Sequence, residues 1–225
     1  MKILAITGGS GSGKSTVLRA LADHLGPRAS MLSLDDYYRP KEELPMDGNG
    51  ETNFDLPEAI DHVALHRDIV KLSRGEQVSF QSYTYNKDLM TSEFTVVEPR
   101  EWLIVEGLFV MCYPDVVEMA DVKAFIHASP EIRLSRRKDR DLNVRGYAPE
   151  EVDYQWKHHV SPAYSAHIEP HQAHSDVVID NDHDWTPGLQ CLIEHLEALG
   201  ASCGNPLEHE KGIHPSHVQN VPTDF

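Results

Sequence analysis

Short apolar stretches alternate along the chain with longer segments in which apolar residues recur every three or four positions. The short stretches are rich in β-branched residues and almost uninterrupted, which is typical of strands buried on both faces of a parallel sheet. We expect strands of this kind within five stretches, namely 2–7, 30–34, 101–110, 122–128 and 176–179. Their alternation with helices predicts an α/β fold in three layers around a mostly parallel sheet.

Helical periodicity, bounded by proline or capping residues at the start and glycine at the end, marks the segments between these strands. Ser129, followed by Pro130, has the side chain of a good N-cap. Two further β-like segments, at 78–80 and 94–97, stand outside the alternation. We expect helices at 17–25, from Pro57 to about Ser73, from Ser129 into an arginine-rich segment, from Pro149 with interruptions at Pro162 and Pro170, and from Thr186 to Gly200.

The length of 225 residues suits one domain with a small subdomain and a tail. We expect the main domain to span 1–200. Within it, the two extra β-like segments predict a small β-subdomain at about 76–98, and the arginine-rich segment predicts a lid at about 133–150. Residues 201–225 are polar with scattered proline and histidine, so a poorly ordered tail is expected there.

A glycine-rich segment follows the first predicted strand and opens the first predicted helix. It reads Gly8-Gly9-Ser10-Gly11-Ser12-Gly13-Lys14-Ser15-Thr16 and fits G-x-x-x-x-G-K-[ST], the P-loop pattern. The backbone N–H groups of such a loop surround an anion, and the positive end of the helix also faces it. Lys14 is expected to reach the β- and γ-phosphates of ATP, and the Ser15 hydroxyl to coordinate Mg²⁺. The order of strand, loop and helix argues against an accidental match.

Carboxylates follow two of the predicted strands, at the edge where open α/β sheets bind ligands. One of Asp35 and Asp36 can orient an acceptor hydroxyl and take its proton, or the pair can cap a turn. If the segment is extended, successive side chains alternate and only one of the two faces the acceptor. Glu106 comes at the end of a buried strand, where a carboxylate is costly unless it is compensated. This position favours a partner of Mg²⁺ over a buried structural ion pair.

The formal net charge of −16 argues against a nucleic-acid or membrane-surface partner, because a polyanion would be repelled. A local basic cluster is therefore informative, and we interpret it as a lid whose guanidinium groups meet phosphates. Asp139 and Asp141 lie among the basic residues, so part of the cluster is expected to be a solvent-exposed charged face. The cluster consists of Arg133, Arg136, Arg137, Lys138, Arg140 and Arg145.

Cysteine usage and hydropathy indicate the compartment. Cys112, Cys191 and Cys203 lack C-x-x-C spacing, which favours reduced thiols. The apolar start runs into the P-loop after a few residues, unlike a signal peptide, and no apolar run approaches the length of a membrane span. We expect a cytoplasmic protein.

Taken in order, these stretches resemble the uridine kinase family of P-loop kinases, from Met1 to about Asp180. The P-loop alone is shared by many proteins, whereas the whole ordered set is specific to this family. Beyond the P-loop, the set comprises Ser33–Tyr38 (SLDDYY), Asn53–Pro57 (NFDLP), Val105–Gly107 (VEG), Arg136–Asp141 (RRKDRD) with Arg145-Gly146, and Ile168–Pro170 (IEP) ahead of Asp176–Ile179 (DVVI).

The resemblance implies phosphorylation of a ribonucleoside 5′-hydroxyl, with uridine or cytidine as substrate and with ATP and Mg²⁺ as cofactors. It also implies a homo-oligomer. The implied roles are a general base at Asp35, ribose contacts from Asp55, a pocket wall from Tyr83, Mg²⁺ ligands at Ser15 and Glu106, a lid and phosphate clamp of Arg137, Arg140 and Arg145, and a position near the active site for Gln155.

Three positions depart from the family pattern. Asp88 stands where the family usually has a pyrimidine-reading histidine, and Met90 and Tyr147 stand where it has arginines. The short spacing from Lys14 to Asp35 also looks like nicotinamide riboside kinases. One alternative is therefore a kinase for another small alcohol, such as nicotinamide riboside, a phosphorylated sugar or pantothenate. A second is a non-catalytic nucleotide-binding switch, which would need no acceptor-side carboxylates.

Overall fold

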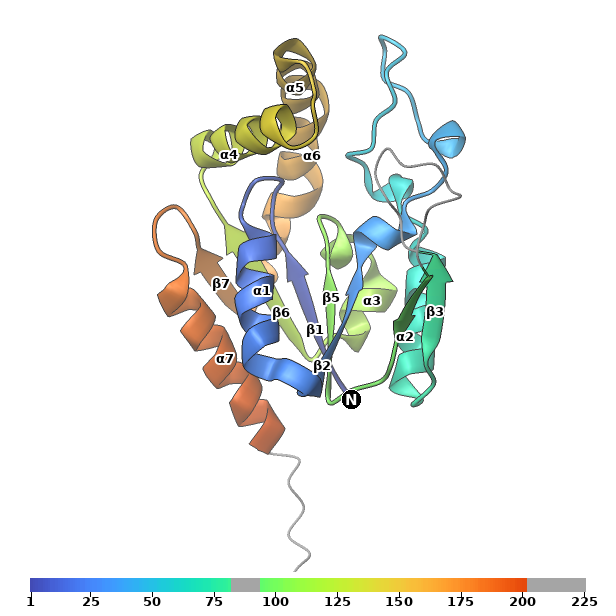
Figure 1. Ribbon diagram of the computed structural model, residues 1–225, viewed down its shortest axis with the longest axis vertical. Helices are drawn as coiled ribbons and strands as arrows, with labels where there is room; N and C mark the ends of the chain where they lie inside the picture. The colour runs from blue at the N-terminus through green and yellow to red at the C-terminus, as the bar shows by residue number, and fades with distance from the viewer. Residues whose placement is uncertain (82–93, 202–225) are drawn as a thin grey trace, which may run out of the picture.

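The computed structural model describes residues 1–81 and 94–201 (Figure 1). Its centre is a five-stranded sheet in the order β2-β5-β1-β6-β7, and every neighbouring pair is parallel. The mostly parallel sheet expected from the sequence is thus confirmed. The strands are β1 (Lys2–Thr7), β2 (Ala29–Ser33), β5 (Trp102–Glu106), β6 (Val122–His127) and β7 (Val177–Asp180).

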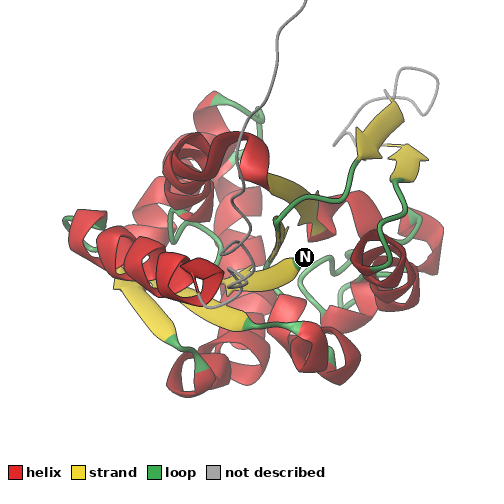
Figure 2. Cartoon of the chain, turned by 90° about the horizontal axis from the view of Figure 1, so that it is seen from below, coloured by secondary structure: helices red, strands yellow, loops and turns green. Residues whose placement is uncertain are grey.

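Helices cover both faces of the sheet, which gives the three expected layers (Figures 1 and 2). Successive side chains of a strand point to opposite faces, so Leu4 and Ile6 pack into one core cluster while Ile3 and Ala5 pack into the other. The first cluster is completed by α1 (Lys14–Leu25) and α7 (Thr186–Ala201), and the second by α2 (His62–Ser73), α3 (Pro114–Met119) and α6 (Ser161–Ala163).

Above the carboxyl ends of the strands lie two helices that belong to neither layer (Figure 1). They are α4 (Pro130–Asn143) and α5 (Pro149–Gln155). α4 and the start of α5 come from the region predicted to form a lid, whereas the rest of α5 lies beyond its expected end at about residue 150. Of the described helices, none combines the length and the apolar character that a membrane crossing requires.

A separate antiparallel pair consists of β3 (Val78–Gln81) and β4 (Phe94–Val97). Val78 and Val97 face each other and are buried against the second core cluster. Both β-like segments seen in the sequence are therefore strands. Residues 82–93, which include Tyr83, and residues 202–225 lie outside the described residues, so the boundaries of the subdomain and of the tail stay predictions.

Two predicted helix features are wrong in detail. The helix expected from Pro57 begins at His62, because Pro57–Ala59 forms a separate 3-10 turn and the Asp61 side chain caps the helix by accepting the N–H of Ala64 at 3.0 Å. Ser129 lies at the N-cap of α4, but its side chain makes no capping hydrogen bond.

The expected interruption at Pro162 is also absent. The chain stays helical from α5 through Ile168, with π-helical turns at Trp156–Val160 and Tyr164–Ile168 on either side of α6. Proline cannot donate a backbone hydrogen bond and crowds the preceding turn, and the wider π-turn accommodates it without a break.

Candidate active site

Three loops that carry predicted site residues meet at one edge of the central sheet. The P-loop follows β1, the segment with Asp35 follows β2, and Glu106 ends β5 between them. The strand register places both Ile6 and Ser33 beside Glu106. Neighbouring parallel strands therefore bring these segments together.

The P-loop is closely enclosed by elements from distant parts of the sequence. Gly11 and Gly13 have φ angles of 78° and 88°, which favour glycine. A Cβ atom at Gly11 would lie 2.2 Å from the backbone oxygen of Arg133, and one at Gly13 would lie 2.1 Å from Nδ2 of Asn181. Asn181 also donates from Nδ2 to the backbone oxygen of Ser12 at 2.7 Å. The glycines thus allow α4 and the end of β7 to support the loop.

The Lys14 ammonium lies inside the P-loop. Its Nζ donates to the backbone oxygens of Gly8 at 2.7 Å and Gly9 at 3.3 Å. Burial lowers the pKa of Lys14, while the carboxylates of Glu106 and Asp35 raise it. The cation is therefore held in a cradle of backbone groups, with two carboxylates close by.

Glu106 receives a short hydrogen bond at the end of β5. Ser33 Oγ donates to Glu106 Oε1 at 2.6 Å. Desolvation raises the pKa of Glu106, and this effect is opposed by the Ser33 hydrogen bond and by the charge of Lys14. A partly buried carboxylate whose anionic form is disfavoured gains from a cation.

Asp35 and Asp36 lie on a 3-10 turn, Leu34–Tyr37, so the expected extended segment is wrong. The turn begins because Ser33 Oγ accepts the N–H of Asp35 at 3.3 Å. Side chains in a 3-10 turn are spaced at three residues per turn, so two neighbours still point in different directions. Asp35 is exposed, and its negative charge favours the charged form of Lys14 and disfavours the ionised form of Glu106. Asp36 is half-buried.

Arg137 joins the lid to the P-loop. Its Nη1 donates to Ser10 Oγ at 2.9 Å and its Nη2 to Gln155 Oε1 at 2.7 Å. Three predicted site residues from the P-loop, α4 and α5 are therefore in direct contact. Arg140 and Arg145 contact Asp141, which is 0% exposed and also lies 3.2 Å from Arg137 Nε. The expectation that Asp141 belongs to a solvent-exposed face is wrong, because the surrounding arginines bury its carboxylate.

Asp55 lies beside the lid arginines. Its N–H donates to Asn53 Oδ1 at 2.9 Å, which forms a turn within its own segment. Desolvation raises the pKa of Asp55, and the charge of Arg137 is the largest influence in the opposite direction. The structure therefore brings Asp55 near the lid, whereas Tyr83 falls outside the described residues.

Sequence reasoning missed the supporting roles of Asn181 and Arg133. Arg133 was grouped with the basic cluster, yet it is 2% exposed and its guanidinium lies 3.5 Å from the ring centre of Tyr164. Its Nε donates to the backbone oxygen of Ala128 at 3.1 Å. The only signal for its burial is its position, one turn before Arg137 on the same side of a helix.

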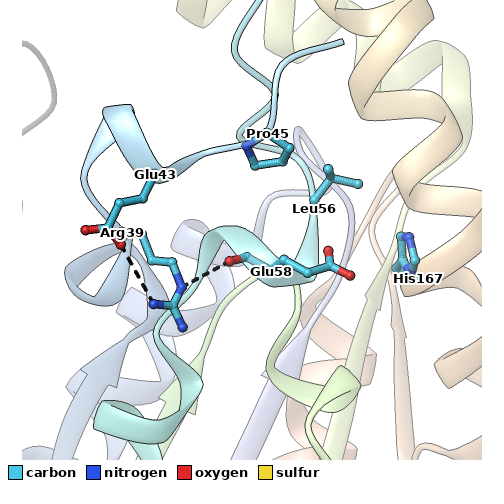
Figure 3. A pocket seen from close by; sticks show the side chains of 6 residues that line it. All are labelled: Arg39, Glu43, Pro45, Leu56, Glu58 and His167. Carbon is cyan, nitrogen blue, oxygen red and sulfur yellow. Dashed lines mark hydrogen bonds and ion pairs between the residues drawn. The ribbon is translucent and has the colours of Figure 1, made fainter.

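A pocket of about 560 Å³ lies apart from the P-loop, beside the segment that carries Asp55 (Figure 3). Arg39 crosses one side of it, where its Nε donates to the backbone oxygen of Glu58 at 3.2 Å. None of the predicted site residues lines this pocket. Its lining residues are Arg39, Glu43, Pro45, Leu56, Glu58 and His167.

The arrangement at the sheet edge suits polyphosphate chemistry. The P-loop offers backbone N–H groups and the Lys14 cation to an anion. The Ser15 hydroxyl and the Glu106 carboxylate supply the hard oxygen ligands that Mg²⁺ prefers, so these residues fit that ion. The arginines above the loop supply further positive charge where a phosphoryl group would pass between substrates.

Comparison with known proteins agrees with this arrangement. The model of the phosphoribulokinase / uridine kinase family matches residues 3–184. A protein of Ligilactobacillus salivarius named uridine kinase is 35% identical over 198 residues, which cover 88% of this chain and 93% of that protein. The structure of phosphoribulokinase from Rhodobacter spheroides aligns with a TM-score of 0.59 at 20% identity, over 80% of this chain and 69% of that one. A possible uridine kinase from Bacillus stearothermophilus aligns with a TM-score of 0.53 at 16% identity, over 79% of this chain and 87% of that one, so both structures share the fold.

Proposed function

The chain belongs to the phosphoribulokinase / uridine kinase family, and we propose that it transfers the γ-phosphoryl group of ATP to the 5′-hydroxyl of a ribonucleoside, with uridine and cytidine as the preferred acceptors. The contact of Arg137 with both Ser10 of the P-loop and Gln155 of α5 carries the proposal, because it puts a cation between the donor site and the acceptor side. The likeness to a uridine kinase over nearly its whole length supports the choice of acceptor.

On the donor side, the P-loop N–H groups and Lys14 bind the β- and γ-phosphates. Lys14 already points into the loop, so binding exchanges its two carbonyl partners for phosphate oxygens. Ser15 and Glu106 would hold Mg²⁺, which neutralises charge on the phosphates when it is bound. The P-loop therefore supplies positioning and electrostatic stabilisation.

On the acceptor side, two carboxylates have separate roles. Asp35 orients the 5′-hydroxyl and accepts its proton, for which its exposed position near Lys14 is suitable. Asp55 binds the ribose hydroxyls, since an ionised carboxylate accepts hydrogen bonds from neighbouring hydroxyl groups. Tyr83 lines the base pocket in this proposal, which extends the family resemblance to a residue outside the described part of the chain.

Above the P-loop, the lid arginines stabilise the charge that spreads over the transferred group. Arg137 and Arg140 act directly on the phosphoryl oxygens, while Arg145 clamps the phosphates from the end of α4. A planar guanidinium group can donate two parallel hydrogen bonds to phosphate oxygens, which suits this role.

The proposal is tested with ATP and Mg²⁺ against uridine, cytidine, adenosine, nicotinamide riboside, ribulose 5-phosphate and pantothenate, by measuring ADP formation. We expect ADP to form only with an added acceptor, and fastest with uridine or cytidine. Lys14→Ala is expected to abolish transfer, because it removes the mobile cation of the loop. Nicotinamide riboside as the best acceptor would replace the proposed substrate. ATP binding without acceptor-dependent turnover would indicate a nucleotide-binding switch.

A further inference from the structure

A fully buried carboxylate lies within the arginine-rich helix α4. Asp141 is 0% exposed, and withdrawing such a charge from water is costly unless cations compensate it. Its Oδ1 accepts a hydrogen bond from Arg140 Nε at 2.7 Å, its Oδ2 lies 3.2 Å from Arg137 Nε, and its Oδ1 lies 3.4 Å from Arg145 Nη1. One carboxylate therefore contacts the three arginines that the proposed function assigns to the lid.

These arginines do not lie on one regular surface of a helix. Arg137 and Arg140 belong to α4, whereas Arg145 follows the C-cap residue Val144 and precedes Gly146, whose φ is 74°. Asp141 is four residues from both Arg137 and Arg145, so it links the helix to the segment that leaves it. Asp141 is thus the carboxylate that all three cations share.

The contacts of the arginines show which atoms this arrangement leaves for other partners. Asp141 forms an ion pair with Nε of Arg137 without hydrogen-bond geometry, while the two terminal nitrogens of that side chain reach Ser10 and Gln155. Arg140 donates from its Nε to Asp141, and its positive charge helps burial to lower the pKa of Lys14 in the P-loop. The terminal nitrogens of Arg137 are therefore engaged by the P-loop and α5, whereas Arg145 meets the carboxylate through its own terminal Nη1.

We propose that Asp141 is a positioning residue for the transfer reaction, whose buried carboxylate holds Arg137, Arg140 and Arg145 as one preformed cationic clamp above the P-loop. The inference rests on the proposed function. Three neighbouring guanidinium groups repel one another, and the carboxylate offsets that repulsion before any nucleotide binds. Donors that are already oriented need little reorganisation when charge develops on the phosphoryl group, so Asp141 acts on the rate through the arginines.

The contrasting role is purely structural. Asp141 could stabilise the end of α4 without any relation to the reaction, and its backbone oxygen does accept the N–H of Tyr147 at 3.0 Å. A structural role predicts a lower unfolding temperature and an effect on kcat that is independent of Arg140. A positioning role predicts that the effect of Asp141 on kcat shrinks once Arg140 has been removed, because only Arg137 and Arg145 then still depend on the carboxylate.

The test is a double-mutant cycle on kcat in the full-length protein, with uridine and ATP·Mg²⁺ as substrates. The variants are Asp141→Asn, Arg140→Ala and the double variant. We expect Asp141→Asn to lower kcat by about 10- to 100-fold, as is common when a residue that orients a ligand-binding side chain is lost. The KM for uridine should change little. We expect Asp141→Asn to slow the Arg140→Ala variant by a clearly smaller factor than it slows the wild type, because only the contributions of Arg137 and Arg145 remain to be lost.

Asp139→Asn is the matched control, because Asp139 lies on the same helix and is exposed. Its carboxylate accepts a hydrogen bond from Asn143 at 2.8 Å, and the amide keeps an oxygen for that bond. We expect near-normal kcat in this variant. An equal loss in Asp139→Asn, or independent losses that multiply in the double variant, would overturn the proposal.

A second substitution covers the case in which Asp141→Asn does not fold, as judged by circular dichroism. Asp141→Glu keeps the charge but moves the carboxylate by one methylene group, so we expect a smaller loss in kcat that again shrinks in combination with Arg140→Ala. Independent effects of Asp141→Glu and Arg140→Ala would contradict the proposal. A wild-type protein that is inactive with every acceptor would instead contradict the proposed function, so the two failures are distinguishable.

Discussion

At the scale of single residues, the two carboxylates after β2 have different surroundings. Asp35 is exposed, and its negative charge is felt by Lys14 and Glu106. Asp36 is half-buried and lies near Tyr37, whose pKa is raised by burial and by Asp68, with a smaller contribution from Asp36. The 3-10 turn that carries them separates their directions, so one acceptor hydroxyl cannot meet both equally. The proposed assignment of the base to Asp35 follows from this difference together with the family resemblance.

We predict that Asp35→Asn lowers kcat with uridine by about 10²- to 10⁴-fold, because the amide keeps the shape but cannot accept the proton. ATP affinity should stay near that of the wild type. Asp36→Asn is the matched control and should lose clearly less activity, or lose it mainly through a higher Mg²⁺ requirement. Steady-state kinetics across a Mg²⁺ titration separates these cases. A severe loss in Asp36→Asn with Asp35→Asn nearly intact would move the base to Asp36.

Cys112 provides a test of burial at a single atom. Burial raises the pKa of its thiol to about 12, and the Glu58 carboxylate contributes in the same direction. At pH 8 the reactive thiolate is then roughly 10³-fold scarcer than for an ordinary cysteine. We predict that iodoacetamide labels Cys112 about 10³-fold more slowly in the folded protein than in urea. Peptide mass spectrometry measures both rates, with the exposed Cys191 as the control. Equal rates at Cys112 in both states would contradict its burial.

Some residue positions follow from the sequence because a short motif carries their geometry. The spacing of the P-loop fixes where Lys14 lies relative to the glycines, and the structure places its Nζ inside the loop. The burial of Asp141 does not follow in this way. A run of alternating charges suits a solvated face equally well until Arg145 folds back from beyond the helix end.

At the scale of elements, the contact between the P-loop and α4 can be tested with two glycines. Gly11 and Gly50 have φ angles of 78° and 83°, but only Gly11 faces a neighbour, the backbone oxygen of Arg133. Gly50→Ala should therefore lower the free energy of unfolding by only about 1–2 kcal/mol, which is the strain of an alanine in the left-handed conformation. Gly11→Ala should cost more and weaken ATP binding by about 10-fold or more, because the loop must move away from α4.

Urea unfolding and ATP titration measure the two effects. The Gly50→Ala variant is expected to bind ATP normally, so it controls for the strain common to both substitutions. Equal losses of stability with normal ATP binding in both variants would mean that the P-loop does not depend on its contact with α4.

The segment between Met46 and Thr52 is anchored to α5 and the following turn through Asp47. Oδ1 of Asp47 accepts the N–H groups of Asn49 and Glu51 at 2.8 and 3.0 Å, while Oδ2 accepts hydrogen bonds from Tyr154 and from His159. The hydrogen bonds from Tyr154 and His159 hold the pKa of Asp47 well below its usual range. The carboxylate is therefore ionised in the folded protein at neutral pH.

We predict that Asp47→Asn speeds hydrogen exchange at the backbone amides of Asn49 and Glu51, because an amide is a weaker acceptor than a carboxylate. Asp184→Asn is the matched control, since its carboxylate accepts the N–H of Thr186 in another turn. That variant should leave exchange at Asn49 and Glu51 unchanged. Unchanged exchange in Asp47→Asn as well would show that the carboxylate does not hold this segment.

The existence of the elements is better predicted than their ends. The sequence favours a helix start at Pro57, which is well suited to a first helical position, yet the helix begins at His62, five residues later, with Asp61 as its cap. Two start signals compete in this stretch, and the sequence does not rank them. The helix continues through Pro162 because the π-turns on either side accommodate a residue that cannot donate a backbone hydrogen bond. Residues of this stretch pack against the second core cluster, and the sequence does not predict that packing.

At the scale of the whole molecule, the sheet brings distant segments to one edge. The sequence predicts the parallel strands but not the order β2-β5-β1-β6-β7, since that order depends on where each crossover packs. It is this order that sets Glu106 between the P-loop and Asp35. The net charge of −16 makes the local arginines above that edge more significant, because elsewhere the surface would repel a nucleotide.

The central claim is that the γ-phosphoryl group of ATP passes to the 5′-hydroxyl of a ribonucleoside. The most direct measurement is mass spectrometry and ³¹P NMR of the products formed from ATP·Mg²⁺ with uridine, beside a parallel reaction with 5′-deoxyuridine. We predict equal amounts of ADP and uridine 5′-monophosphate from uridine. No phosphorylated product should form from 5′-deoxyuridine, which lacks only the acceptor hydroxyl. A phosphorylated 5′-deoxyuridine, or ADP and free phosphate formed at the same rate without any nucleoside, would contradict the claim.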